Sequence, residues 1–198
     1  MEKFTTKEKI ALGIIGLIVL AIFIQVAAHL DLFTRAFSGV EAKPIPGVEP
    51  GRNLLAAEGV VVTASSHNND RETADRVRDG NPSSFWHVNL EQVGQPASLI
   101  VDFGEANPRS VRALAAKPRS DLPRQFLRKA TLSGSNDGED WDNLADILLL
   151  DPPADSGWLQ WDLDNDRGYR FYRLQIDQGH EDGSRFNFYS LAELALLD

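Results

Sequence analysis

Short runs of β-branched and alternating apolar residues, separated by turn-forming residues, constrain the fold of this chain more than any other feature. Residues 60–63 read Val-Val-Val-Thr, and apolar and polar side chains alternate within residues 158–163, as is typical of β-strands. Comparable runs occupy residues 98–103, 111–115, 130–135, 171–176 and 192–196. A short helix is predicted only at residues 72–77. Short strands joined by turns such as SNDGED predict an all-β sandwich or barrel.

Composition fits a globular domain and narrows its chemistry. Apolar residues make up 42% of the chain and charged residues 25%, which are ordinary values for a folded domain. The net charge of −9 disfavours nucleic acid as a partner, because phosphate binding needs clustered Lys and Arg. The chain has no cysteine, which excludes disulfides, thiolate zinc sites and a cysteine nucleophile.

The N-terminal region has the pattern of a membrane anchor. Residues 10–28 are apolar or Gly except for Gln25, and the run is close to the length that crosses a bilayer, with no polar face. Lys3, Lys7 and Lys9 precede it, so the positive-inside rule places residues 1–9 in the cytoplasm. We therefore predict a single transmembrane helix at residues 10–30 and a periplasmic or extracellular remainder. A cleavable signal peptide is the alternative.

The segment after the expected span has two parts. Its first residues, 31–40, have helical spacing and are expected to continue the helix or to lie at the membrane interface. Residues 42–51 hold three prolines and two glycines and are expected to form an extended spacer. We place residues 31–52 between membrane and domain, and the folded domain at residues 53–198.

The sequence DGNPSSFW at residues 79–86 carries many oxygen atoms in a tight turn. Gly80 permits positive φ and Pro82 fixes its own φ. Asp79, Asn81 and Ser84 can then direct several oxygens to one point, as a hard cation such as Ca²⁺ requires. The alternative is a polar turn that hydrogen-bonds within itself, with Trp86 anchored in the core.

In order along the chain, the motifs of residues 53–197 resemble those of the discoidin family, also called F5/8 type C domains or family-32 carbohydrate-binding modules. The shared motifs are residues 53–55 (NLL), 62–66 (VTASS), 79–81 (DGN) with Trp86, 99–104 (LIVDFG), 132–138 (LSGSNDG) with Trp141, 172–174 (YRL) and 190–194 (SLAEL). The resemblance implies a jelly-roll β-sandwich of about eight strands, similar to galactose-binding domains.

The resemblance also implies a structural Ca²⁺ site. Asp79 and Glu193 would supply carboxylates and Ser84 its hydroxyl, while the carbonyls of Asn81, Ser84 and Ala192 would complete the ligands. One ion would then join the start of the domain to its end. Two opposed carboxylates with no cation between them would repel.

Ligands of this family usually contact loops at one end of the sandwich. The corresponding loops here are residues 67–71, 87–89, 117–120 and 180–189. The predicted ligand-binding residues are His67, Asn68, Arg71 and Arg119 for sugar hydroxyls, with Phe186, or alternatively Phe188, for stacking. Simpler structural roles are the alternatives: Arg71 would pair with Asp70 or Glu72, and Phe186 would enter the core together with Phe188.

No catalytic motif is present, so the domain is not expected to be an enzyme. His67, His87 and His180 lack the spacing of a preformed zinc site, and no zinc is predicted. The favoured function is a membrane-anchored module that binds a cell-envelope or extracellular carbohydrate. The alternative is an accessory subunit of a larger membrane complex, in which Gln25 would hydrogen-bond a partner helix.

Overall fold

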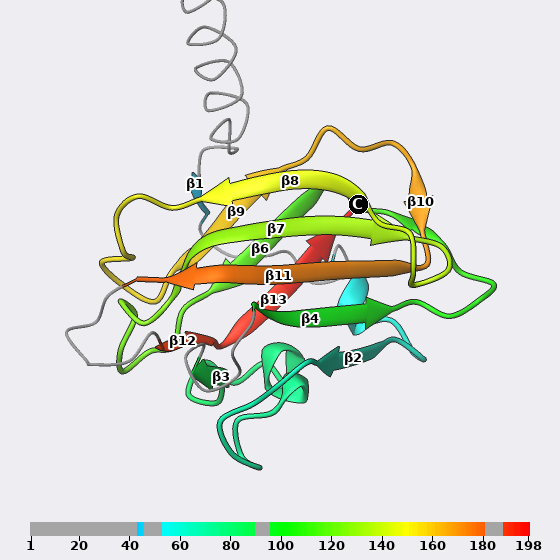
Figure 1. The fold of residues 1–198 in the computed structure, drawn as a ribbon. Coiled ribbons are helices and arrows are strands. Elements are labelled where there is room, and N and C mark those ends of the chain that lie inside the picture. Colours follow the sequence, from blue (N-terminus) through cyan, green and yellow to red (C-terminus); the bar gives the residue numbers. More distant parts are fainter. Residues whose placement is uncertain (1–42, 46–52, 90–95, 181–187) are drawn as a thin grey trace, which may run out of the picture. The chain divides into compact units, whose positions relative to one another are not determined.

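Two stacked β-sheets form the domain in the computed structural model, which describes residues 43–45, 53–89, 96–180 and 188–198. The first sheet has the strand order β2-β4-β11-β7-β8 and the second the order β1-β9-β6-β13. In Figure 1 the strands of the second sheet run diagonally behind those of the first. The all-β sandwich predicted from the sequence is confirmed.

All neighbouring strands within the sheets are antiparallel. The first sheet contains β2 (Val61–Ala64), β4 (Ala97–Asp102), β11 (Phe171–Gly179), β7 (Leu127–Ser135) and β8 (Asp142–Leu148). The second contains β1 (Lys43–Ile45), β9 (Trp158–Asp162), β6 (Ala113–Lys117) and β13 (Glu193–Leu197). Residues 43–45, which were expected within an extended spacer, therefore form an edge strand.

Two small sheets close the ends of the sandwich. One pairs β3 (Trp86–Asn89) with β12 (Phe188–Leu191), and the other pairs β5 (Arg109–Ser110) with β10 (Gly168–Tyr169). The expected number of about eight strands is therefore too low. Residues 87–89 and 188–189, expected in loops, lie in strands because each segment supplies the backbone partners of the other.

The core lies between the sheets and is built by alternation. In β4 the side chains of Ala97, Leu99 and Val101 are buried, while those between them are half-exposed. The largest fully buried side chains are Trp86, Trp161, Tyr172, Tyr189 and Phe126, so the expectation that Trp86 belongs to the core is confirmed. Burial of such large aromatic surfaces is the main stabilising contribution to a sandwich of this kind.

Helical structure among these residues is limited to two short 3₁₀ segments, η1 (Leu54–Ala56) and η2 (Ala74–Arg78). The helix predicted at residues 72–77 is therefore shorter, tighter and displaced toward the C-terminus. Within the described part of the chain no helix is long and apolar enough to cross a bilayer. The predicted span at residues 10–30 and the segment 31–42 lie outside the described residues.

Candidate functional site

The β3–β12 pair places polar and aromatic side chains at one end of the sandwich. His87 of β3 is paired with Ser190 of β12, and Trp86 with Leu191. All four residues of β3 are buried, including His87 and Asn89. Buried polar side chains require hydrogen-bond partners. The partners of His87 come from a loop earlier in the sequence.

That earlier partner is Glu72, just before η2. Glu72 Oε2 accepts hydrogen bonds from Asn68 Nδ2 at 3.0 Å and lies 2.9 Å from His87 Nδ1. The backbone joins the same segments, because Asn68 N donates to His87 O and His87 N donates to Glu72 O. Burial raises the pKa of Glu72, but hydrogen bonds from Asn68 and His87 and the charge of His87 outweigh it, so the pKa lies below its ordinary value.

The other ring nitrogen of His87 has no such partner. His87 Nε2 is buried and makes no hydrogen bond with the described residues. The His87 ring contacts Phe188 at a centroid distance of 5.1 Å and Phe85 at 6.0 Å. An imidazole held by a carboxylate on one side and by aromatic rings around it keeps one nitrogen in a fixed position for hydrogen bonding.

Arg119 adds a cation to this group. Its guanidinium stacks on the Phe85 ring, with Cζ 3.7 Å from the ring centroid. Nε and Nη2 donate to the two carboxylate oxygens of Asp121 at 2.6 and 2.7 Å, and Nη1 donates to Gln125 Oε1 at 3.1 Å. The Arg119 side chain is only 14% exposed. Hydrogen bonds from Arg119 hold the pKa of Asp121 below its usual range.

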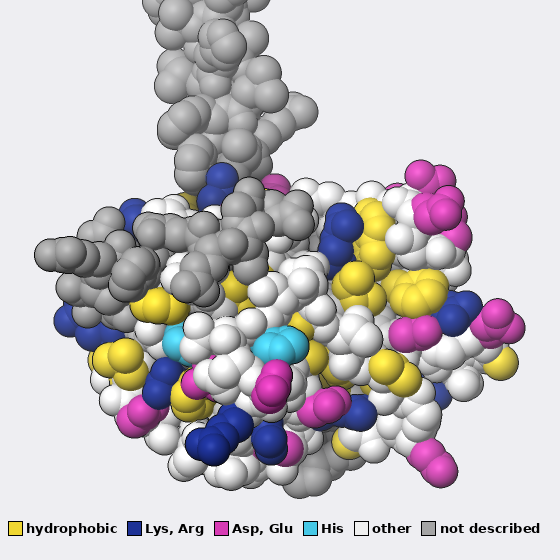
Figure 2. Space-filling model, turned by 60° about the horizontal axis from the view of Figure 1, so that its bottom comes forward, with side chains coloured by type: hydrophobic (Ala, Val, Ile, Leu, Met, Phe, Trp, Pro, Cys, Tyr) yellow, Lys and Arg dark blue, Asp and Glu magenta, His cyan; other side chains and the backbone are white. Residues whose placement is uncertain are grey.

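We call the connected set Asn68, Glu72, Phe85, His87, Arg119 and Phe188 the polar row. Figure 2 shows the face at the bottom of the Figure 1 view, where histidine side chains lie among acidic, basic and apolar ones. Fixed donors and acceptors next to half-buried aromatic rings are the combination that recognises sugars, whose hydroxyls need hydrogen bonds and whose CH faces need apolar contact.

A second cluster of oxygen atoms lies in the turn after η2. Gly80 adopts φ +71, and Asp79 Oδ1 accepts from the N–H of Asn81 at 2.9 Å. Ser84 Oγ is 2.6 Å from Asp79 Oδ2 and 3.0 Å from the carbonyl oxygen of Asn81. The turn therefore directs a carboxylate, a hydroxyl and a carbonyl toward one another.

Glu193 of β13 reaches the same turn from the far end of the sequence. Burial first, and then the negative charge of Asp79, raise the pKa of Glu193 to about 7, against the lowering effects of Lys117 and of the backbone N–H groups of Gly80 and Asn81. Its Oε1 is buried without a hydrogen-bond partner in the described structure. Glu193 therefore lies near enough to Asp79 for the two carboxylates to interact electrostatically.

Comparison with known proteins decides the family. A family model of the F5/8 type C domain matches residues 61–194, more than half of the chain. The chain belongs to the F5/8 type C family. The resemblance read from the sequence motifs is thereby confirmed. None of the curated proteins matches the chain.

Solved structures share the fold of this F5/8 type C domain. CpGH89CBM32-5 from Clostridium perfringens, in complex with GalNAc-β-1,3-galactose, has a TM-score of 0.58 and 20% identity over 70% of this chain and 95% of its own. The family 32 module of C. perfringens NanJ, in complex with galactose, has a TM-score of 0.57 and 22% identity. The match covers 70% of this chain and 93% of that module. The family 32 module of AlyQ, in complex with 4,5-unsaturated mannuronic acid, has a TM-score of 0.54 and 18% identity. The match covers 69% of this chain and 92% of that module.

The predicted ligand residues of this F5/8 type C domain separate into two groups. Asn68 and Arg119 lie in the polar row. His67 Nε2 lies 3.8 Å from Asp70 Oδ1, and both side chains are solvent-exposed. The Arg71 side chain is exposed, and the Arg71 backbone N–H and carbonyl form hydrogen bonds with Asn69 and Arg76. Phe186 lies outside the described residues.

Sequence reasoning missed Glu72 and Phe85 as members of the row, and it placed His87 and Phe188 only in candidate ligand loops. Glu72 was assigned to a short helix and Phe85 to a turn, and neither assignment suggested a binding role. The available signal was a weak one: His87 and Phe188 are polar and aromatic residues inside segments that also carry strand-forming neighbours. Their proximity depends on pairing between residues about a hundred positions apart.

Proposed function

We propose that this domain is a non-catalytic module that binds a carbohydrate at the polar row. The observation that carries the proposal is the half-buried Glu72–His87 pair beside the stacked Arg119, which together offer fixed donors and acceptors next to aromatic rings. The solved relatives that hold galactose or GalNAc-β-1,3-galactose support it.

Calorimetric titration of the full-length protein with galactose and N-acetylgalactosamine tests this function. Arg119→Ala should weaken binding by at least ~10-fold, because a hydrogen-bonded and stacked donor is lost. Arg167→Ala removes an arginine that pairs with Asp142 instead, so this variant should bind like the unchanged protein. Absence of heat with every neutral sugar tested would contradict the proposal.

We also propose that Ca²⁺ binds between the η2 turn and β13. The buried, partnerless Glu193 Oε1 and the raised pKa of Glu193 fit a cation site, because a nearby divalent charge would offset both burial and the repulsion of Asp79. Asp79, Glu193 and Ser84 would hold the ion with the carbonyls of Asn81, Ser84 and Ala192. The bound ion would supply only structural cross-linking of the two chain segments.

Thermal unfolding of the full-length protein in EDTA and in CaCl₂ tests the calcium proposal. The unfolding midpoint should rise with Ca²⁺, and Asp79→Asn with Glu193→Gln should abolish the rise. Asp75→Asn, an exposed acid on η2, is the matched control and should keep it. A midpoint that does not respond to Ca²⁺ near neutral pH would exclude the site.

We propose, finally, that residues 10–30 anchor the chain in a membrane with the domain on the periplasmic or extracellular side. The apolar run and the lysines before it support this arrangement. Fractionation of cells expressing the full-length chain and a chain without residues 1–30 tests it: only the first should stay in alkali-washed membranes. Stoichiometric co-purification of a membrane protein would favour the accessory-subunit alternative.

A further inference from the structure

Arg119 and Glu72, the ionised side chains of the polar row, each already have a close hydrogen-bonding partner. Arg119 forms a two-point ion pair with Asp121, and Glu72 is paired with His87. Neither Arg119 nor Glu72 is freely hydrated, since their side chains are 14% and 21% exposed. The row therefore offers a ligand hydrogen-bonding groups without an uncompensated cation.

The remaining donors of Arg119 suit hydroxyl oxygens. A guanidinium has five N–H groups, and Asp121 and Gln125 take three of them, leaving one on each terminal nitrogen. The Nε–Nη2 edge, one of the guanidinium edges that can bind both oxygens of a carboxylate, is filled by Asp121, and Gln125 takes an N–H of Nη1. A sugar hydroxyl needs only one donor and brings no charge, so it can bind Arg119 without displacing Asp121.

A sugar carboxylate would meet an unfavourable environment at the same place. The pKa of Glu72 lies below its ordinary value, so Glu72 is ionised near neutral pH. Asp121 is ionised as well, because the Arg119 guanidinium lowers its pKa. A sugar carboxylate that bound the remaining N–H groups of Arg119 would lie close to the ionised Asp121 carboxylate on the same guanidinium, and like charges at such short range repel.

We propose that the polar row binds neutral sugars and rejects uronic acids, and that Asp121 sets this preference by occupying the carboxylate-binding edge of Arg119. The proposal rests on the carbohydrate-binding function proposed above and specifies its ligand class. Among the solved relatives, it places this protein with the modules that hold galactose rather than with the AlyQ module that holds an unsaturated mannuronic acid. Specificity then arises from a group that opposes the wrong ligand.

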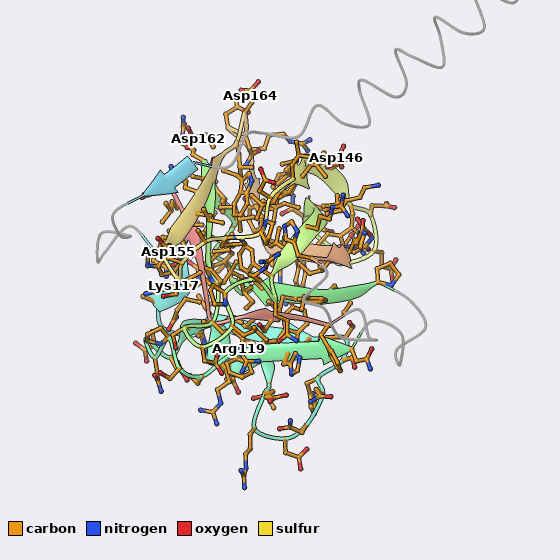
Figure 3. All side chains as sticks on the ribbon, turned by 90° about the vertical axis from the view of Figure 1, so that its left-hand side faces the viewer. Lys117, Arg119, Asp146, Asp155, Asp162 and Asp164 are labelled. Atoms are coloured by element: carbon orange, nitrogen blue, oxygen red, sulfur yellow. The ribbon has the colours of Figure 1, made fainter. Side chains whose placement is uncertain are left out.

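The test compares galactose with galacturonic acid, which differ at C6, on the full-length protein and two charge-matched variants. Asp121→Asn removes the carboxylate from Arg119. Asp164→Asn removes the same charge far from Arg119; Figure 3 shows Arg119 and Asp164 at opposite ends of the domain. Because both variants change the net charge equally, any difference between them reports the local ion pair. Asp121→Ser is a second variant with a smaller side chain.

The unchanged protein and Asp164→Asn should bind galactose at least ~10-fold more tightly than galacturonate. Asp121→Asn and Asp121→Ser should narrow this ratio to ~3-fold or less, mainly by binding galacturonate better. Raising the salt toward 1 M should narrow the ratio in the unchanged protein too, because the Debye length falls to about 3 Å.

Galacturonate binding as tightly as galactose to the unchanged protein would overturn the ligand class while leaving carbohydrate binding in place. An unchanged ratio in both Asp121 variants would overturn the role of Asp121. If the protein binds neither sugar nor any other glycan on an array that contains both classes, the carbohydrate-binding function fails, and the ligand class fails with it.

Discussion

The guanidinium carbon of Arg119 lies 3.7 Å from the centre of the Phe85 ring. A planar guanidinium on an aromatic face is fixed in plane as well as in position. Here that plane directs one edge to Asp121 and a terminal nitrogen to Gln125. Phe85 is therefore a positioning residue for Arg119, although it carries no hydrogen-bonding group.

Replacing Phe85 by Leu should weaken galactose binding by ~3- to 10-fold, because a stacked cation loses about 0.5–1.5 kcal/mol of fixed contact. Titration calorimetry measures the change. Trp141→Leu is the matched control: Trp141 stacks on Arg173 at 4.2 Å, outside the row, so its loss should not change the affinity. Equal losses in the two variants would mean that both act through general stability.

Replacing Glu72 by Gln should loosen His87 and Asn68 together, because the amide can no longer accept charge-assisted hydrogen bonds from both. We expect a loss of about 1–2 kcal/mol in the free energy of unfolding and ~10-fold weaker galactose binding. Urea unfolding and calorimetry measure the two effects. Glu58→Gln, at an exposed loop position, should change neither.

The stability of the metal-free protein should fall as the pH rises from 4.5 to about 7. Glu193 has a folded pKa of about 7 against an ordinary value of 4.5, so in this window the folded state holds a proton that the unfolded state has lost. By linkage the loss is on the order of 3 kcal/mol. Urea unfolding in EDTA at pH 5 and pH 8 measures it.

Glu193→Gln should flatten this pH dependence, since the amide does not titrate. The stabilisation by Ca²⁺ should instead increase as the pH rises above 7, because cation binding needs the ionised carboxylate of Glu193. A protein whose Glu193→Gln variant keeps the full pH dependence would show that another group titrates.

Replacing Gly134 by Ala should destabilise the fold by about 1–3 kcal/mol, as in other overpacked cores. A Cβ at this position would lie 2.6 Å from Cδ2 of Tyr169, a buried ring that cannot move freely. Gly168→Ala is the control, because its nearest contact would be an ordinary 3.6 Å. Thermal unfolding of both variants should show a large shift for the first and a small one for the second.

Local patterns were sufficient for the strands that alternate between a core face and a solvent face. β4 and residues 171–176 of β11 bury every second residue, and the sequence predicts both segments. β3 was missed because all four of its residues are buried, so it shows no alternation. β8 was missed as well, since its polar first residues, Asp142 and Asn143, are exposed and resemble a loop.

The two candidate sites differed in predictability for a physical reason. Asp79, Asn81 and Ser84 lie within one turn, so local geometry brings them together and the family motif adds Glu193. The polar row has no such local frame. Glu72, His87 and Arg119 come from three separate segments, and only the pairing of β3 with β12 and the stacking on Phe85 bring them together.

One isolated bridge joins Asn53 to Leu197, so the first described residue of the domain proper lies beside the last strand. Leu197 and Glu193 are at opposite ends of β13. Glu193 is paired with Lys117 of β6, and Arg119 follows Lys117 by two residues in the sequence. The carboxyl end of the chain, one residue after Leu197, therefore lies at the end of β13 away from Lys117. A sensor chip coupled through the carboxyl end would therefore leave the polar row open to the solution.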